Sequence, residues 1–228
     1  MQIRLLSDGT FKLDGGAMHG VVPKALWEKA NPPDEKNRIL LSVNSLLIED
    51  GKEKILIEPG IGVGHSEKFS SLYCIEKQRT LLSDLDSIGV GPNDITKVIV
   101  THLHFDHGGG LVDWKTGKLI FPKAHIVVQR KELEAAFNPH PKNQASYLPE
   151  FIEPIRTANL ELVSGEQEIV PGIRVFLTGG HTHGHQAVFV ESEKTVLAYP
   201  GDLMPTAAHV NPLWTMAYDV DPERAIAM

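Results

Sequence analysis

The sequence has little cysteine, no excess of positive charge and no long apolar run. Its single cysteine, Cys74, excludes an intramolecular disulfide and a metal cage made of thiolates. The formal charge of −7 argues against a nucleic-acid partner, because such a partner requires a basic face. No apolar stretch approaches the length of a membrane span, and the first residues lack the apolar core of a secretion signal. We therefore expect a cytoplasmic protein with no membrane partner.

Histidine, by contrast, is abundant and unevenly distributed along the chain. Of eleven histidines, three lie within residues 102–107 and three more at positions 181, 183 and 185. A random distribution would rarely produce two such clusters. Imidazole is a preferred ligand of zinc and similar divalent metals, so the two clusters indicate a metal site.

Hydrophobic periodicity predicts strands and helices in mixed order. An opening strand or hairpin with Asp8-Gly9 at its turn covers residues 3–16, and Asp50-Gly51 predicts a hairpin between the next two strands. Apolar residues at three- and four-residue steps predict one or two helices within 66–88 and another at 130–137. The remaining strands are expected at residues 40–48, 54–58, 97–100, 125–128, 160–163, 173–178, 186–191 and 195–199, the last two joined by a turn at Glu193-Lys194. This order favours a mixed α/β sandwich over a doubly wound parallel sheet.

Three segments lie outside these elements. Residues 15–23 form a glycine-rich loop that is either a plain connection or a cover over a pocket. Residues 138–154 contain four prolines and are expected to form a long surface excursion. Near the end, Asp221 and Pro222 are typical of a helix start, yet only about two turns follow, short of the usual ~11 residues. We therefore expect that the chain is cut inside a helix.

The first histidine cluster follows directly after the apolar run 98–100. His102 and His104 are two residues apart, so on an extended segment both rings point to one side and can reach one metal. Asp106 and His107 lie just beyond, where the backbone turns, and can reach a second metal about 3.5–4 Å from the first. The alternative, histidines of the core or surface without a metal, is hard to sustain for four ligand-type residues in six.

The second cluster and a nearby carboxylate also follow apolar strands. His181 is the natural third imidazole for the first metal, whereas His185 is assigned a supporting role and His183 a place at the mouth of the site. Asp202 follows the strand 195–199 and a tight glycine turn, where it is well placed to bridge both metals. Each of the three predicted strands is followed by ligand-type residues, which is consistent with one shared metal site.

These motifs resemble those of the metallo-β-lactamase superfamily. The resemblance is carried by His-x-His-x-Asp-His at 102–107, Gly-His-Thr-x-Gly-His at 180–185 and Gly-Asp at 201–202, in that order and spacing. Residues 14–23, 202–206 and 209–214 further resemble the branch that contains quorum-quenching lactonases and methyl-parathion-type hydrolases. The resemblance extends from the first hairpin to the end of the chain.

The resemblance implies a single domain over residues 1–228 with a four-layer αββα sandwich, here without its last helix and strand. It implies two divalent metal ions, zinc above all, bound by His102, His104 and His181 at the first position and by Asp106 and His107 at the second, with Asp202 bridging. The family has one more ligand of the second metal, a histidine near the carboxyl terminus. After Asp202 this chain has one histidine, His209, which is too early to match it, so the second position is incomplete.

The ligands predict a hydrolase. Two cations lower the pKa of a shared water towards ~7, which supplies hydroxide to attack an ester or lactone carbonyl, and Asp106 is the expected proton carrier. We expect a small-molecule lactone, with N-acyl homoserine lactones favoured, although the tyrosine that better-known lactonases carry three residues after the bridging aspartate is Pro205 here. The residues expected to line the substrate pocket are Met18, His19, Val21, Val22, Phe105, Met204, His209 and Trp214.

Two other functions remain open. An arylesterase or organophosphate triesterase would use the same pair of metals. A metal-binding or redox module without hydrolytic activity is a third interpretation, but iron-based redox relatives replace His104 by a carboxylate and this chain keeps histidine. A homodimer is compatible with the sequence.

Overall fold

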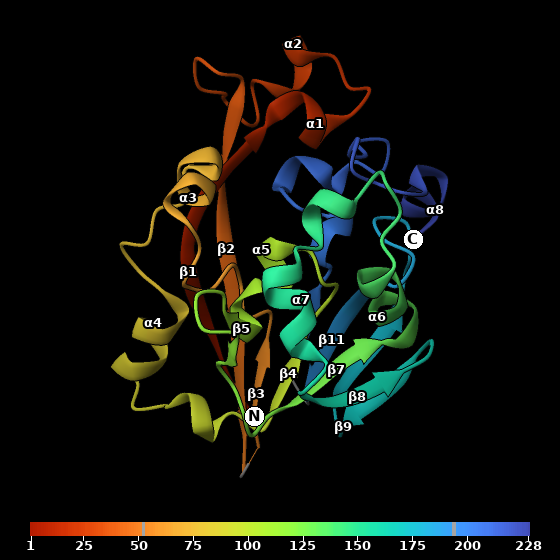
Figure 1. Cartoon of the computed structure of the whole chain (residues 1–228). Coiled ribbons are helices and arrows are strands. Elements are labelled where there is room, and N and C mark those ends of the chain that lie inside the picture. The colour runs from red at the N-terminus through yellow and green to blue at the C-terminus, as the bar shows by residue number, and fades with distance from the viewer. Residues whose placement is uncertain (52, 193–194) are drawn as a thin grey trace.

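Two β-sheets packed face to face form the centre of the protein in a computed structural model, which describes residues 1–51, 53–192 and 195–228 (Figure 1). The first sheet has the strand order β1-β2-β3-β4-β7-β8 and the second the order β12-β11-β10-β9. A small separate hairpin joins β5 (Val112–Asp113) to β6 (Lys118–Leu119). The strands of the first sheet are β1 (Gln2–Asp14), β2 (Arg38–Asp50), β3 (Glu53–Ile57), β4 (Lys97–Ile99), β7 (His125–Gln129) and β8 (Asn159–Val163); those of the second are β9 (Gln167–Val170), β10 (Ile173–Leu177), β11 (Gln186–Ser192) and β12 (Thr195–Tyr199).

The first sheet changes from antiparallel to parallel pairing at β3. Strands β1, β2 and β3 pair antiparallel, whereas β4, β7 and β8 run parallel to β3 and to one another. Parallel neighbours end at the same edge, so the residues that follow β4 and β7 emerge side by side. The second sheet is antiparallel throughout.

Strand alternation produces two hydrophobic cores. Ile55 and Ile57 of β3 face the second sheet and pack with residues such as Val175 and Val188, while Leu56 between them faces the helices. All five of these side chains are fully buried. Both faces of the first sheet are apolar and must be shielded from water: the second sheet covers one face and the helices cover the other. The mixed α/β sandwich expected from the sequence is confirmed.

Helices cover the outer face of the first sheet and the rim of the site. The long apolar segment 66–88 makes two helices, because α3 ends at Cys74, whose backbone is left-handed (φ 48°). The helix expected at 130–137 is confirmed as α6. The helices are α1 (Gly15–His19), α2 (Lys24–Trp27), α3 (Glu67–Tyr73), α4 (Leu81–Ser87), α5 (Phe105–Gly108), α6 (Arg130–Phe137), α7 (Pro149–Ile155) and α8 (Pro222–Ala227).

Short 3-10 turns connect several of these elements. They are η1 (Pro92–Asp94), η2 (Gly109–Leu111), η3 (Gln144–Ser146), η4 (Gly201–Leu203) and η5 (Ala207–Val210). In the part of the chain that the structure describes, no helix has the length and apolar character needed to cross a bilayer.

Of the strand or hairpin expected over residues 3–16, the strand is confirmed and the hairpin is not, because β1 is one continuous strand with an irregularity between Ser7 and Thr10. The Asp8 carboxylate turns inward and accepts hydrogen bonds from the backbone N–H groups of Gly62 and Leu81, at 2.9 and 3.0 Å. An aspartate and a glycine therefore mark a bulge here and not a chain reversal.

Two further expectations from the sequence need correction, and one strand was not predicted. The loop at 15–23 contains the short helix α1, capped by the Asp14 side chain, which accepts from the N–H of Ala17. The second half of the excursion at 138–154 is α7, whose residues Phe151, Ile152 and Ile155 are buried. Strand β9 has no counterpart among the strands predicted from the sequence. The hairpin expected at Asp50-Gly51 is confirmed, because β2 pairs antiparallel with β3 and Asp50 lies opposite Glu53. Lys52 and the turn expected at Glu193-Lys194 lie outside the described residues.

Candidate metal centre

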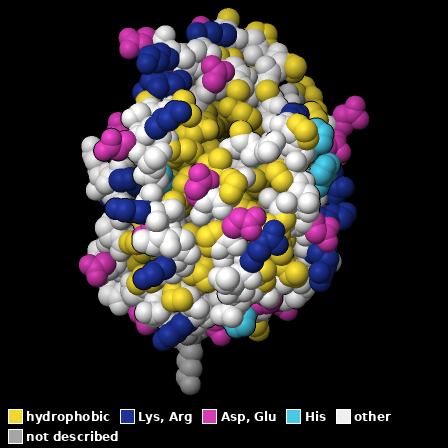
Figure 2. Space-filling model, in the orientation of Figure 1, with side chains coloured by type: hydrophobic (Ala, Val, Ile, Leu, Met, Phe, Trp, Pro, Cys, Tyr) yellow, Lys and Arg dark blue, Asp and Glu magenta, His cyan; other side chains and the backbone are white. Residues whose placement is uncertain are grey.

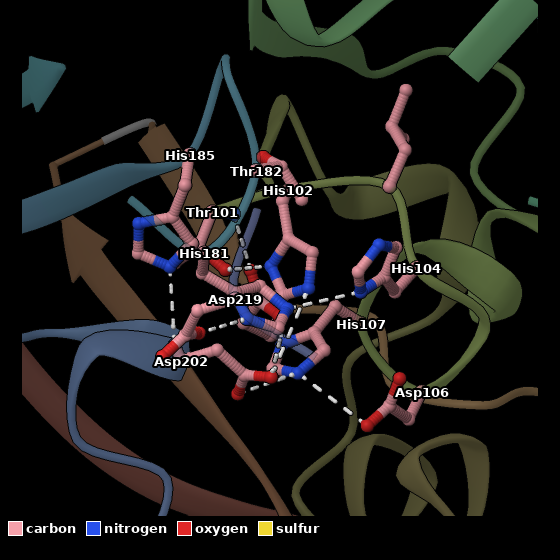
Figure 3. A network of polar contacts seen from close by, with 12 residues as sticks. Thr101, His102, His104, Asp106, His107, His181, Thr182, His185, Asp202 and Asp219 are labelled. Carbon is pink, nitrogen blue, oxygen red and sulfur yellow. Dashed lines mark hydrogen bonds and ion pairs between the residues drawn. The ribbon is translucent and has the colours of Figure 1, made fainter. Parts of the chain in front are cut away.

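The site lies where both sheets end at the same edge. β4 leads into His102 and His104, and α5 begins immediately afterwards, so Asp106 and His107 occupy its first turn. His181 follows β10, and Asp202 follows β12 within η4. Figure 3 shows the imidazoles and carboxylates of these segments converging on one point. Strand ends that are distant in the sequence thus supply one cluster, as the sequence predicted.

Three buried imidazoles form the first group. His102, His104 and His181 each place a ring nitrogen in a common cluster, and their exposure is 5% or less. Nδ1 of His104 lies 3.0 Å from Nε2 of His181. Nε2 of His102 and Nε2 of His104 are buried and have no hydrogen-bond partner in the described structure. Two ligands of a tetrahedral zinc are roughly 3.3 Å apart, given zinc–nitrogen bonds of about 2.0–2.1 Å, so these residues fit such an ion.

A second group shares one histidine with the first. His102, His107 and Asp202 place their ligand atoms together. The two oxygens of Asp202 face different groups: Oδ2 lies 3.2 Å from Nε2 of His181, and Oδ1 lies 3.1 Å from Nε2 of His107. Oδ2 of Asp106 is 3.6 Å from the same His107 nitrogen. A carboxylate with one oxygen on each side has the geometry of a bridge between two cations.

Burial and charge set the protonation of the cluster. Burial lowers the pKa of His102 and His104 well below its usual range, and neighbouring imidazoles add to this, so both are neutral as metal ligands must be. Burial opposes the charged form of His107, but the carboxylates of Asp202, Asp106 and Glu58 outweigh it and hold the pKa of His107 well above its usual range. Burial raises the pKa of Asp106 to about 6.

Glu58, at the end of β3, supports the second group and was not identified from the sequence. Its carboxylate contacts Nδ1 of His107 and accepts from the N–H of Thr101 at 2.5 Å. The residue is 1% exposed and has a left-handed backbone (φ 61°), which is uncommon for a residue with a side chain. The sequence feature that could have identified Glu58 is its position at the end of a buried strand, directly before Pro59-Gly60.

A second buried carboxylate, Glu132 on α6, joins the two ligand loops. It accepts from the N–H of Leu103, between the first two histidines, at 2.8 Å, and from the hydroxyl of Thr182 at 2.5 Å. Tyr147 also donates to it at 2.8 Å, and the Tyr147 ring packs against His104. Nothing in the local sequence distinguishes Glu132 from a solvent-exposed helix residue.

The other histidines of the second cluster have different positions. His185 is fully buried; its Nδ1 pairs with the hydroxyl of Thr178 at 2.6 Å, and its Nε2 accepts from the N–H of Asp202 at 3.1 Å. Gly201 next to it has φ 54°, and a Cβ there would meet that nitrogen at 2.7 Å, so only glycine fits this turn. His183 is exposed and does not line the cavity, which corrects its expected place at the mouth.

A cavity of about 330 Å³ opens above the cluster. Its floor includes His104, Asp106, His107, His181 and Asp202. Apolar side chains gather around the hollow on this face of the molecule (Figure 2). The walls come from β1 and β2, from α3 and from the segment after β12, through residues that include Phe11, Leu13, Leu41, Val43, Tyr73, Met204 and Tyr218.

The expected pocket residues divide into two sets. Met18, Phe105 and Met204 line the cavity. The other five do not: Val21 points to solvent with 89% exposure, and Val22 packs against the hydrophobic core. The remaining three belong to a separate aromatic cluster made of His19, Trp27, His209 and Trp214.

Within that cluster, polar contacts explain why the histidines are not part of the cavity. Nδ1 of His19 donates to the carbonyl of Gly15 at 2.7 Å, and Nε2 of His209 to the carbonyl of Met18 at 2.8 Å. The two rings stack with centroids 5.2 Å apart. The hydrogen bond of His209 and the stacking of the two rings hold the segment after β1 against the segment after β12, which indicates a structural role for both residues.

Comparison with known proteins agrees with this geometry. A model described as the Metallo-beta-lactamase superfamily matches residues 38–226. An N-acyl homoserine lactonase of Bacillus cereus is 30% identical over 171 residues, which are 71% of this chain and 63% of the relative. One from a Bacillus species is 32% identical over 68% of this chain and 60% of its own length. The chain thus spans about three fifths of the length of the curated relatives it matches.

Solved structures give the same result. A probable metal-dependent hydrolase from Staphylococcus aureus has a TM-score of 0.93 and 37% identity, covering 99% of this chain and 81% of that one. An N-acyl homoserine lactone hydrolase with N-hexanoyl-L-homoserine at its catalytic metal centre has a TM-score of 0.76 and 27% identity, covering 99% and 84%.

Proposed function

The chain belongs to the metallo-beta-lactamase superfamily, and from that membership we propose that it is a metal-dependent hydrolase that opens lactone rings, with N-acyl homoserine lactones as favoured substrates. The observation that carries the proposal is the position of Asp202, whose two oxygens face two different groups of ring nitrogens. A single metal site would not require a carboxylate in that place. Relatives named as N-acyl homoserine lactonases support the choice of substrate.

The first metal position would be formed by His102, His104 and His181, and the second by Asp106 and His107, with Asp202 between them. Two divalent cations, zinc above all, would supply Lewis acidity and a hydroxide nucleophile at neutral pH. Neutral imidazoles and an ionised bridging carboxylate are the donor set that such ions prefer.

The chain's own residues would orient the reaction. Asp106 lies on the cavity floor, 3.6 Å from the ring of His107, where its carboxyl group can take a proton and return it to the oxygen that leaves the opened ring. Glu58 holds His107, and Glu132 holds the loops that carry His104 and His181, so the ligands keep their positions during turnover.

The cavity walls favour a substrate with an apolar tail. Phe11, Leu13 and Leu41 line the same cavity as the ligand-type residues and give it apolar surface. An acyl chain would lie against this surface, while the lactone ring reaches the floor.

A second candidate, hydrolysis of aryl esters or organophosphate triesters, is favoured by the aromatic part of the same wall. The rings of Tyr73 and Phe105 are 4.6 Å apart, and Phe11 makes an edge contact with Phe105. Aromatic rings in these arrangements can take an aryl group against their faces or edges.

One experiment separates these candidates. The metal content of the purified protein is measured first, the protein is then loaded with zinc, and hydrolysis of hexanoyl homoserine lactone is compared with that of a paraoxon-like ester. We expect two divalent ions per chain and turnover of the lactone, with the metal-stripped protein and a His102→Ala variant as blanks for contaminating hydrolases. Lactone turnover at the level of those blanks would overturn the first candidate, and turnover of the ester alone would support the second. One iron per chain would instead indicate a redox module.

A further inference from the structure

A carboxylate outside the predicted ligand set, that of Asp219, contacts the ring of His181, one of the candidate ligands. Asp219 lies between η5 and α8, 38 residues after His181, and both side chains are almost fully buried. Oδ1 of Asp219 lies 2.9 Å from Nδ1 of His181 (Figure 3). We propose that Asp219 is a positioning residue that fixes the tautomer and orientation of His181 for metal binding; the inference rests on the metal site proposed above.

The second carboxylate oxygen of Asp219 also accepts a hydrogen bond. Oδ2 accepts from the backbone N–H of Met216 at 2.9 Å, and the N–H of Asp219 donates back to the carbonyl of Met216 at 3.2 Å. This closed turn sets the direction of the carboxylate. Because an ionised carboxylate can only accept, the single proton of the neutral His181 imidazole, the form that binds a metal, must lie on Nδ1. Nε2 is then unprotonated and faces Nδ1 of His104 and Oδ2 of Asp202.

Backbone contacts hold the two segments together. The N–H of Val220 donates to the carbonyl of His181 at 3.2 Å, and the N–H of Asp221 donates to the carbonyl of Gly180 at 2.9 Å. Residues 219–221 therefore run alongside the ligand loop. These backbone hydrogen bonds bring Asp219 alongside His181, where the two buried side chains meet.

Asp219 also connects the site to the cavity wall. The ammonium group of Lys142 donates to the backbone carbonyl of Asp219, and Lys142 itself lines the cavity. The same short segment therefore anchors the excursion that begins at residue 138 and orients a ligand of the first metal. A partner that holds the ring of a ligand histidine typically changes metal affinity about 10- to 100-fold when it is removed.

The test replaces Asp219 by asparagine. Both oxygens of Asp219 face N–H groups, so the amide introduced by D219N must turn its NH₂ towards one of them. The arrangement that avoids an N–H to N–H clash places the proton of His181 on Nε2, which blocks the nitrogen needed for the metal. We expect D219N to bind zinc about 10- to 100-fold more weakly in competition with a chromophoric chelator. Asp221→Asn is the matched control, because Asp221 is exposed, caps α8 and should retain wild-type affinity.

The tautomer can be read directly and without metal. Long-range ¹H–¹⁵N correlation spectra of histidine-labelled apo protein at alkaline pH should show His181 protonated on Nδ1 in the wild type and on Nε2 in D219N. The signals of His181 are identified by their loss in His181→Ala. A wild-type His181 protonated on Nε2 would overturn the proposal even if D219N failed to fold. So would wild-type zinc affinity in folded D219N. Neither measurement uses a substrate, so a failure of the proposed lactonase activity is distinguishable from a failure of this inference.

Discussion

At the scale of single residues, the centre depends on which histidine of a cluster faces inward. His181 is 1% exposed and touches both His104 and Asp202, whereas His183, two residues later, is exposed and outside the cavity. The two differ in partners, not in chemical type. His181 belongs to the centre because the backbone of its loop is paired with residues 220 and 221, which turns its ring towards the other ligands.

This difference yields a matched pair of variants. His181→Ala should lose the first metal, because two imidazoles and a shared carboxylate remain where three imidazoles were available. His183→Ala should keep the wild-type metal content, because its side chain lies in solvent. Metal analysis after gel filtration would check both. Equal metal content in the two variants would contradict the assignment of His181 as a ligand.

At the scale of elements, helix α7 shows how an expected surface segment became part of the core. Pro149 occupies the first helical position, where a missing N–H is harmless, and Phe151, Ile152 and Ile155 then fall on one face. The ring of Phe151 stacks on Trp114 with centroids 5.2 Å apart. Four prolines in the segment suggested a loop, but two of them lie within this helix, at its start and near its end.

The burial of α7 gives a stability prediction. Phe151→Ala should reduce the free energy of unfolding by about 3–5 kcal/mol, because it removes a fully buried ring and leaves a cavity. Glu150→Ala, one residue earlier on the exposed side, should change it by no more than about 0.5 kcal/mol. Urea unfolding followed by circular dichroism would measure both. Similar values for the two variants would mean that α7 is not packed as described.

At the scale of the whole molecule, the residues of the proposed metal centre come from both sheets. His102, His104 and His107 follow strands of the first sheet, whereas His181 and Asp202 follow strands of the second. A cation held by both sets would therefore act as a cross-link at the edge of the sandwich. It would bind the folded chain and not the unfolded one, and so stabilise the fold by mass action.

Removal of the metal should consequently lower the melting temperature. Free zinc at 100 times its Kd contributes about 2.7 kcal/mol, which corresponds to roughly 5–10 °C for a chain of this size. Differential scanning fluorimetry before and after treatment with a chelator would show the shift, and added zinc should restore it. His102→Ala is the control, because its melting temperature should respond weakly to either treatment. An unchanged melting temperature in the wild type would argue against a bound cation that links the sheets.

The sequence alone predicted every strand of the two sheets except β9, and it located the first cluster of candidate ligands. A short continuous apolar run such as Ile55-Leu56-Ile57 marks a strand with both faces buried, because successive side chains of a strand point to opposite faces. The spacing of His102 and His104 is likewise local, since residues two apart on an extended segment point the same way. The family resemblance added the order of the three motifs, and with it the sandwich.

Only the tertiary structure decided what holds those ligands and what lines the cavity. Glu58, Glu132 and Asp219 contact the ligand loops from 29 to 50 residues away in the sequence. The end of a buried strand was a local signal for Glu58, but no local pattern distinguishes Glu132 or Asp219 from surface acids. His19 and His209 were expected in the pocket, but their ring nitrogens are bound to backbone carbonyls in a separate cluster. A residue's type and spacing fix which contacts it can make. The folded chain selects among them, because a buried polar group must find its partner wherever the packing brings one.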